Sequence, residues 1–265
     1  MKPQHKISIE NVSVAFGGDA GGPRVIALDG ITAHAQDCEF VALLGPSGCG
    51  KSTLLNLVAG FLQPTTGRVV VDGVDVQQPG PERAVVFQDA NLFPWLSVAK
   101  NVAFGPRVRK AFGEKELREK VEHYLDLVGL GKFANRLPLE LSGGMRQRVA
   151  LARVLINEPR VMLMDEPFGA LDAQTRMVMQ ELLLKIWERQ RMTVLFVTHD
   201  IDEALLLSDR IYTMSSHPGR MIDELVVPFE RPRTYELTME PEFARLGRQL
   251  LDHLHDEARR VATMQ

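Results

Sequence analysis

The sequence has no long run of apolar residues. A helix that crosses a bilayer needs about 20 mostly apolar residues. Even the stretch Val149–Met164 is interrupted by charged and polar residues and a proline, namely Arg153, Asn157, Glu158, Pro159 and Arg160. The first ten residues lack the apolar core of a signal peptide, and two cysteines are too few for a disulfide framework. We therefore expect a protein of the reducing cytoplasm that does not cross a bilayer by itself.

The sequence also has no excess of positive charge. It carries 31 Lys and Arg residues against 34 Asp and Glu residues, a net charge of −3, with an isoelectric point near 6.2. Dedicated nucleic-acid-binding domains are usually strongly basic, so DNA and RNA are not the expected partners. The 265 residues are 45% hydrophobic and 25% charged, which predicts one large domain or a domain with a subdomain.

The first forty residues predict an antiparallel sheet. Apolar and polar residues alternate along Ile7–Phe16, a glycine-rich turn covers Gly17–Pro23, and a second apolar run begins at Val25–Leu28. Alternation with a period of two is typical of a strand with one buried face. Phe16, at the end of the first strand, is either a core residue or part of a ligand site.

A glycine-rich loop follows the next predicted strand. Phe40–Leu44 is a continuous apolar run, typical of a strand buried on both faces, and a helical run extends to about Leu62. Between them, residues 45–52 fit the phosphate-loop pattern G-x-x-x-x-G-K-[ST], and Thr53 follows directly. The loop residues are Gly45, Pro46, Ser47, Gly48, Cys49, Gly50, Lys51, Ser52 and Thr53. In such a loop, backbone N–H groups surround phosphate, the lysine adds charge and the serine hydroxyl can bind Mg²⁺. A turn that binds nothing is the alternative, which the flanking strand and helix disfavour.

The rest of the chain mixes helices with short buried strands. From about Leu92 to Asn157 the apolar spacing is helical, which predicts a helical subdomain inserted into an α/β core. Residues 241–262 predict one amphipathic helix. The expected strands are Arg68–Val71, Ala84–Phe87, Val161–Met164, Thr193–Val197 and Arg210–Met214. Their separation by helices in the later part of the chain is typical of a parallel sheet.

Two adjacent carboxylates follow one of these strands. Asp165 and Glu166 come directly after Val161–Met164, and ligands bind at the carboxyl ends of strands in open α/β sheets. Beside a phosphate loop, Asp165 is expected to hold Mg²⁺, and Glu166 to orient and deprotonate an attacking water. An isolated Asp-Glu pair could instead simply solvate the strand end.

A second group of small residues precedes a helix. In Leu141–Met145, Ser142, Gly143 and Gly144 stand where helix N–H groups can bind an anion. Taken alone, Ser-Gly-Gly before a helix is more often an ordinary N-cap.

Together these motifs resemble the ATP-binding subunit of an ABC transporter, from about Ile7 to Val227. The Walker A loop is Gly45–Thr53, the Walker B strand ends at Asp165, and Leu141–Met145 is similar to the LSGGQ signature with Met145 in place of Gln. The other landmarks in register are the Q-loop Gln88, the D-loop Gly169–Asp172, the switch His199 and an adenine-stacking Phe16. This resemblance implies a P-loop NTPase (RecA-like) core of the α/β class with an N-terminal antiparallel β subdomain. It also implies a cassette over residues 1–240, with its helical subdomain at about 92–157, and a C-terminal helical tail over 241–265.

The resemblance further implies a head-to-tail homodimer that holds ATP and Mg²⁺ between two subunits. Ser142, Gly143, Gly144 and Asp172 would act across the interface. In the same subunit as the phosphate loop, Glu166, His199, Gln88 and Lys51 would be the catalytic group, and Ser52, Gln88 and Asp165 the metal group. Met145 removes an amide near the nucleotide, and we expect it to weaken contacts on the ribose side at most.

Within the family, several stretches look most like the nitrate/sulfonate/taurine importer group. The resemblance implies an ATPase on the cytoplasmic face of the bacterial inner membrane, with transmembrane permease subunits and, indirectly, a periplasmic solute-binding protein as partners. Trp95, in the apolar stretch Leu92–Leu96, belongs either to the core or to a groove for a permease helix, and strong exposure would favour the groove. A non-transport ABC ATPase of assembly or repair type and a binding-only regulator remain the alternatives.

Overall fold

The computed structural model describes residues 5–17 and 24–263, so residues 18–23 of the predicted glycine-rich turn lie outside the described part. The chain forms two compact units. The first contains residues 1–80 and 191–265, and the second contains residues 81–190. Each unit is described by itself.

The first unit contains the predicted antiparallel sheet, with strand order β2-β1-β4-β5. Its strands are β1 (Ile7–Phe16), β2 (Val25–Ala35), β4 (Thr66–Val71) and β5 (Val74–Asp75). Along β1 the apolar side chains alternate into the core, and Ile7 lies opposite both Ala35 and Val71. The prediction of this sheet is confirmed. Strand β2 runs seven residues beyond Leu28, because buried Ile31, Ala33 and Ala35 continue the alternation past Gly30.

A second group of strands in this unit has the order β10-β9-β3-β8. Strands β3 (Phe40–Leu44), β8 (Thr193–Thr198) and β9 (Arg210–Met214) are parallel, as the sequence predicts, and β10 (Met221–Val226) is an antiparallel edge. Every residue of β3 and β8 is buried. Helices α1 (Lys51–Ala59), α6 (Ile201–Leu207) and α7 (Pro241–Thr263) and a short 3₁₀ turn, Tyr235–Met239, complete the unit. Helix α1 ends before the expected Leu62 because Gly60 is left-handed (φ +82).

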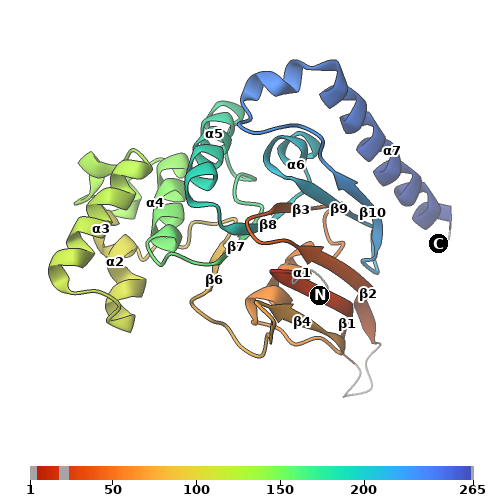
Figure 1. Ribbon diagram of the computed structural model, residues 1–265, viewed down its shortest axis with the longest axis horizontal. Helices are drawn as coiled ribbons and strands as arrows, with labels where there is room; N and C mark the ends of the chain where they lie inside the picture. Colours follow the sequence, from red (N-terminus) through yellow and green to blue (C-terminus); the bar gives the residue numbers. More distant parts are fainter. Residues whose placement is uncertain (1–4, 18–23, 264–265) are drawn as a thin grey trace. The chain divides into compact units, whose positions relative to one another are not determined.

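The second unit is mostly helical. Two parallel strands, β6 (Arg83–Val86) and β7 (Val161–Asp165), are joined by a helical region that matches the predicted insertion. Its helices are α2 (Val98–Arg109), α3 (Glu114–Leu127) and α4 (Gly143–Leu155), with 3₁₀ turns at Gly131–Phe133 and Pro138–Glu140. Figure 1 shows α2, α3 and α4 packed side by side. Helix α5 (Ala173–Gln190) follows β7.

The C-terminal segment is the single amphipathic helix that the sequence predicts. Helix α7 packs against α6 (Figure 1), and Phe243, Leu246 and Leu250 are buried. The apolar residues repeat every three or four positions, which suits a helix with one buried face. Within residues 5–17 and 24–263, the structure contains no helix with the length and apolar character needed to span a membrane.

Candidate nucleotide-binding site

The glycine-rich loop connects β3 to α1, in the predicted strand–loop–helix order. Gly48 (φ +78) and Gly50 (φ +96) adopt left-handed backbone conformations that other residues rarely tolerate. A Cβ atom on Gly50 would stand 2.6 Å from the Leu28 side chain, whereas one on Gly48 would meet nothing within 4 Å. The glycine at position 50 therefore fits a tight turn, and Gly48 borders open space.

Lys51 lies inside this loop. Its side chain is only 4% exposed, and its Nζ atom donates hydrogen bonds to the Gly45 and Pro46 carbonyls at 2.8 and 2.9 Å. Pro46, Ser47, Gly48 and Ser52 form an exposed rim. A buried cation surrounded by exposed N–H and hydroxyl groups is a donor set that suits a phosphate oxygen, and a hydroxyl at Ser52 suits a hard cation such as Mg²⁺. The residues present thus fit a magnesium–nucleotide.

The switch histidine of the sequence analysis belongs to the same edge of the first unit. Leu44, which precedes the loop, lies opposite Thr198 on parallel strand β8. His199 follows Thr198 directly and is exposed. Because neighbouring parallel strands end at one edge of a sheet, the phosphate loop and His199 are brought together there.

A hydrogen-bonded turn fixes the backbone around His199. The hydroxyl of Thr198 donates to Glu203 Oε2 at 2.7 Å and accepts from the Asp200 N–H at 3.0 Å. The Asp200 carboxylate caps α6 by accepting from the N–H groups of Asp202 and Glu203. Burial, followed by the Asp200 charge, raises the pKa of Asp202 above its usual range.

The segment from Ser215 to Arg220 packs directly against the phosphate loop at Cys49. The sequence alone assigns this segment no role in the site. A Cβ atom on Gly219 would stand 2.1 Å from the Cys49 carbonyl oxygen. The Gly219 N–H donates to the Ala27 carbonyl, and its own carbonyl accepts from the Asp29 N–H. The Pro218-Gly219 dipeptide is the signal in the sequence, since such pairs mark tight turns where backbones come close together.

The two predicted carboxylates belong to the second unit. Asp165 ends β7, and Glu166 follows it with a left-handed backbone (φ +43), which costs free energy for a residue with a side chain. Gln88 follows β6, and its Nε2 atom stands 3.3 Å from where a Cβ atom on Gly169 would lie. The same position on Gly169 is 3.4 Å from the Glu166 carbonyl oxygen. Gln88, Glu166 and the D-loop glycine are therefore neighbours.

The signature residues start helix α4. Ser142 is its N-cap, and the Ser142 hydroxyl accepts a hydrogen bond from the Met145 N–H at 3.3 Å. The ordinary capping role is therefore real, while Ser142 and Gly143 stay exposed. Gly144 is buried, and a Cβ atom there would stand 2.4 Å from the Thr175 methyl group. A side chain at position 144 would therefore force Thr175 of α5 to move.

Asp172 of the D-loop caps the next helix. Its carboxylate accepts from the Thr175 N–H at 3.0 Å and from the Thr175 hydroxyl at 2.7 Å. These bonds hold the pKa of Asp172 below its usual value, the hydroxyl contributing most. Thr175 lies outside every motif of the sequence; the capping signal that was present is Asp172 itself, because aspartate is a preferred N-cap residue.

Two aromatic residues were left undecided by the sequence. Phe16 is 47% exposed at the end of β1, so it is not a core residue. Trp95 is 73% exposed, with its ring 5.7 Å from that of Phe93. This exposure favours a surface role for Trp95.

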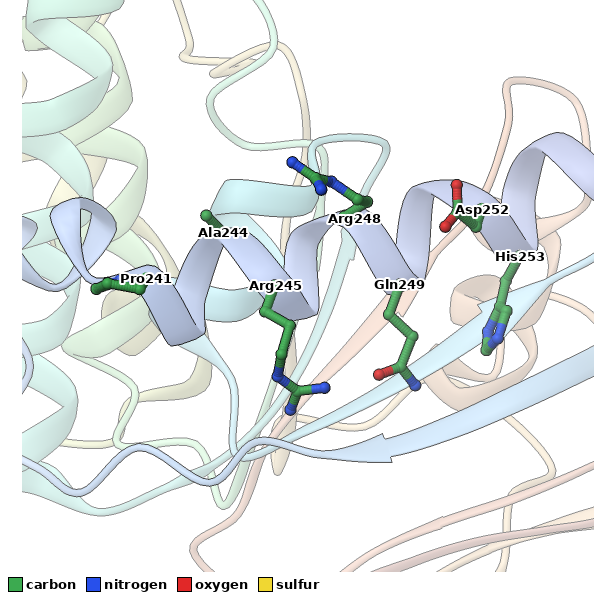
Figure 2. A pocket seen from close by; sticks show the side chains of 7 residues that line it. All are labelled: Pro241, Ala244, Arg245, Arg248, Gln249, Asp252 and His253. Carbon is green, nitrogen blue, oxygen red and sulfur yellow. The ribbon is translucent and has the colours of Figure 1, made fainter.

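A separate cavity of about 540 Å³ lies along α7 in the first unit. Figure 2 shows Arg245, Gln249 and His253 on the same side of the helix, one turn apart. Arg245 pairs with Glu242, and His253 Nδ1 is 2.8 Å from the Asp223 carboxylate of β10. The residues that line the cavity, which all come from α7, include none of the predicted site residues.

The predicted site residues thus divide between the units. The phosphate loop, Phe16 and His199 belong to the first; Gln88, the two carboxylates, the signature residues and Asp172 belong to the second.

Comparisons with known proteins extend over most of the chain. The family model described as ABC transporter matches residues 28–169. A nitrate import ATP-binding protein (NrtD) of Synechococcus elongatus is 50% identical over 237 residues, which cover 88% of this chain and 86% of that protein. A taurine import ATP-binding protein (TauB) of Ruegeria pomeroyi is 49% identical over 223 residues, which cover 84% of this chain and 82% of that protein. A solved dimeric ATP-binding cassette in a post-hydrolysis state with ADP and Pi has a TM-score of 0.72 and 33% identity, covering 84% of this chain and 100% of that one.

Proposed function

The chain belongs to the ABC transporter family, and we propose that it is the ATP-hydrolysing subunit of an importer for a small anion. Taurine, alkanesulfonates and nitrate are the candidate solutes, since relatives about half identical in sequence are named for nitrate and taurine import. The observation that carries the ATPase is the loop from Gly45 to Thr53, in which the buried Lys51 ammonium lies among exposed donors at the end of β3.

Each site residue takes a role that its chemistry suits. Bound Mg²⁺ would neutralise charge on the β- and γ-phosphates, with Ser52, Gln88 and Asp165 holding it directly or through water. Lys51 would bind the phosphates, and the loop residues Gly45, Pro46, Ser47, Gly48, Cys49, Gly50 and Thr53 would surround them. Glu166 would hold and deprotonate the attacking water, while His199 would donate a hydrogen bond to the γ-phosphate. Phe16, exposed at the end of β1, would stack on adenine.

The signature residues and Asp172 would serve a second copy of the chain. In a head-to-tail homodimer, Ser142, Gly143 and Gly144 of one subunit would bind the γ-phosphate held by the phosphate loop of the other, and Asp172 would link the two sites. Two observations support this: the exposure of Ser142 and Gly143, and the dimeric cassette with ADP and Pi that the chain resembles. A single subunit outside the dimer would then contain only half of each of two sites, the phosphate loop of one and the signature of the other.

The remaining partners would supply the path across the membrane. We infer transmembrane permease subunits, an indirect periplasmic solute-binding protein and a peripheral position on the cytoplasmic face of the inner membrane. The exposed Trp95 would contact a permease helix in a helix-in-groove arrangement. Purification of the complex, followed by an ATPase assay in vesicles with taurine, alkanesulfonates and nitrate, would identify the solute by its stimulation.

The substitution Glu166→Gln tests the chemistry. We expect ATP binding to persist and turnover to fall at least about 100-fold, since a positioned general base contributes 10²–10⁴-fold. The ATP-bound dimer would then be long-lived and visible by size-exclusion chromatography. Lys51→Ala is the contrasting variant, because it should weaken phosphate binding itself. Parental turnover in Glu166→Gln would exclude Glu166 as the base.

The same assays separate the alternatives. A binding-only regulator would show no Mg²⁺-dependent hydrolysis, either free or with its membrane partners. An assembly or repair ATPase would hydrolyse ATP but purify without permease subunits.

A further inference from the structure

The segment 87–97, which we call the strap, connects β6 to α2 without forming a helix or strand of its own. Its N-terminal half is held by two side chains of α4. Gln147, which is 5% exposed, donates from Nε2 to the Phe87 carbonyl at 3.2 Å. Arg153 donates from Nη1 to the Asn91 carbonyl at 2.6 Å and from Nη2 to the Ala90 carbonyl at 2.8 Å.

The C-terminal half of the strap is held by α2. Asn101 is completely buried. Its Nδ2 atom donates to the carbonyls of Phe93, Leu96 and Ser97 at 3.1, 2.9 and 3.1 Å. Its Oδ1 atom accepts from the Phe93 N–H at 2.8 Å. A single amide thus fixes the turn that presents Trp95.

The strap joins two places that the proposed function uses. At its tip, Trp95 is exposed and its neighbour Phe93 packs against Phe104 of α2, with ring centroids 4.5 Å apart. At its start, the residue after Phe87 is Gln88. The N-cap of helix α4, which holds the strap, is Ser142, eleven residues before Arg153 and about 16 Å away along the helix axis.

We propose that Arg153, Gln147 and Asn101 are positioning residues that make the strap and helix α4 one mechanical element. A displacement of Trp95 by a permease helix is then transmitted through the strap to Arg153 and along α4 to the signature at Ser142. Backbone carbonyls of an irregular segment could be satisfied by water. Three of them are instead bonded to side chains of the signature helix, two by one planar guanidinium whose paired donors fix orientation as well as distance. This inference rests on the proposed function, in which a permease helix contacts Trp95.

Coupling between two sites is reciprocal, so engagement of the signature must also change the surroundings of Trp95. Trp95 can be observed selectively, because it is 73% exposed and the second tryptophan, Trp187, is 1% exposed. Iodide, which is charged and stays in water, therefore quenches the fluorescence of Trp95 in the intact chain.

The experiment measures the iodide quenching constant of the full-length Glu166→Gln protein before and after addition of Mg²⁺-ATP. We expect ATP to change the constant by about two-fold, and we expect Arg153→Met in the same background to lose most of that change. Arg153→Lys, which keeps one charged donor, should retain part of it. Arg148→Met is the matched control, since Arg148 also lies on α4 but donates to the Val128 carbonyl at 3.4 Å, outside the strap. Gln147→Leu provides a second variant in case Arg153→Met folds poorly.

A second measurement requires no nucleotide. The fast local component of Trp95 fluorescence anisotropy, identified as the part that iodide removes, should grow about two-fold in Arg153→Met but not in Arg148→Met. The proposal is wrong if this component is equal in the two variants, or if Arg153→Met keeps the full response to ATP. Failure of the proposed function is recognised separately: the parent protein then shows no Mg²⁺-dependent hydrolysis or purifies without permease subunits. The anisotropy comparison, which needs no nucleotide, still decides whether Arg153 holds the strap.

Discussion

Thr175 connects two segments of the second unit through different parts of one side chain. Its hydroxyl donates to the Asp172 carboxylate of the D-loop at 2.7 Å. Its methyl group lies only 2.4 Å from the position that a Cβ atom on Gly144 would occupy. A residue that no motif contains therefore sets the spacing between two segments proposed to face the partner subunit.

Thr175→Val and Thr175→Ser separate these two contacts. The hydroxyl is the main cause of the lowered pKa of Asp172, so valine should raise that pKa toward the usual value while serine leaves it low. Because the pKa of Asp172 is lower in the folded than in the unfolded protein, its carboxylate stabilises the fold at pH values above the unfolded pKa. This stabilisation is lost as the pH falls through the folded pKa. Valine should reduce this stabilisation, which is present at neutral pH and is already lost in acid. An NMR titration of the Asp172 carboxyl checks the prediction, and an unchanged pKa in the valine variant would contradict it.

Cys49 is the small, buried member of the phosphate loop. It is 1% exposed, and burial raises the pKa of its thiol against the opposing charge of Lys51. Burial also raises the pKa of Cys38, which is more accessible. Because only the thiolate reacts, iodoacetamide should modify Cys38 first, and both reactions should accelerate as pH rises. Peptide mass spectrometry gives the order. Modification of Cys49 should then block nucleotide binding, and faster labelling of Cys49 would contradict its burial.

Among the elements, α6 depends on a side chain from far along the chain. Arg233 is 6% exposed, and its Nη1 atom donates to the carbonyls of Leu205, Leu206 and Ser208, the last at 2.7 Å. Burial, together with the charge of Arg231, lowers the pKa of Arg233 to about 10, so it stays protonated at neutral pH. The end of α6, whose carbonyls have no partner within the helix, is thus completed by the segment after β10.

Arg233→Met should leave these carbonyls without a buried donor. We expect the free energy of unfolding to fall by about 3 kcal/mol, in the range for breaking a buried charged network. Urea unfolding followed by circular dichroism measures the loss. Arg245→Met is the control, because Arg245 forms an exposed ion pair with Glu242 on α7 and its removal should change little. Equal stability of the two variants would show that the network contributes nothing.

The elements also show which local signals a sequence carries. Helices α2, α3 and α4 were predictable because their apolar residues recur at helical spacing, and β3 and β8 because each contains a continuous apolar run. Strand β10 was not predicted: its residues alternate between partly and largely exposed, and Asp223 and Glu224 interrupt its apolar character. It becomes a strand by pairing with β9, a contact made in three dimensions.

At the scale of the whole molecule, the motifs predict the residues that we propose carry chemistry but not the contacts that hold those residues in place. The glycine-rich loop and Asp165 could be found because their chemistry demands fixed residue types in a fixed context, and His199 could be found through the resemblance to the ABC family. Thr175, Gly219 and Arg153 act through backbone contacts and single hydrogen bonds. Such contacts join residues distant in sequence, and a single sequence contains no spacing rule for them.

The division of site residues between loop and signature makes a prediction about two copies of the chain. In a head-to-tail dimer, Lys51→Ala disables the loop of its own subunit, and Ser142→Arg disables the signature offered to the partner. When the two variants are mixed, each heterodimer contains one site that combines both defects. Its other site combines an intact loop with an intact signature.

Mixing the two inactive variants should therefore restore hydrolysis. If subunits exchange freely and the sites act independently, half of the dimers are mixed and each has one intact site, so recovery should approach about a quarter of the parental rate. Each variant alone, at the same total concentration, is the control and should stay inactive. A chain with Lys51→Ala and Ser142→Arg together forms heterodimers with no intact site, so mixing it with an equal amount of the parent should lower the rate of those parental subunits by about half. Confirmed heterodimers without recovered activity would contradict the shared site, because only a site built within one subunit is insensitive to the partner's signature.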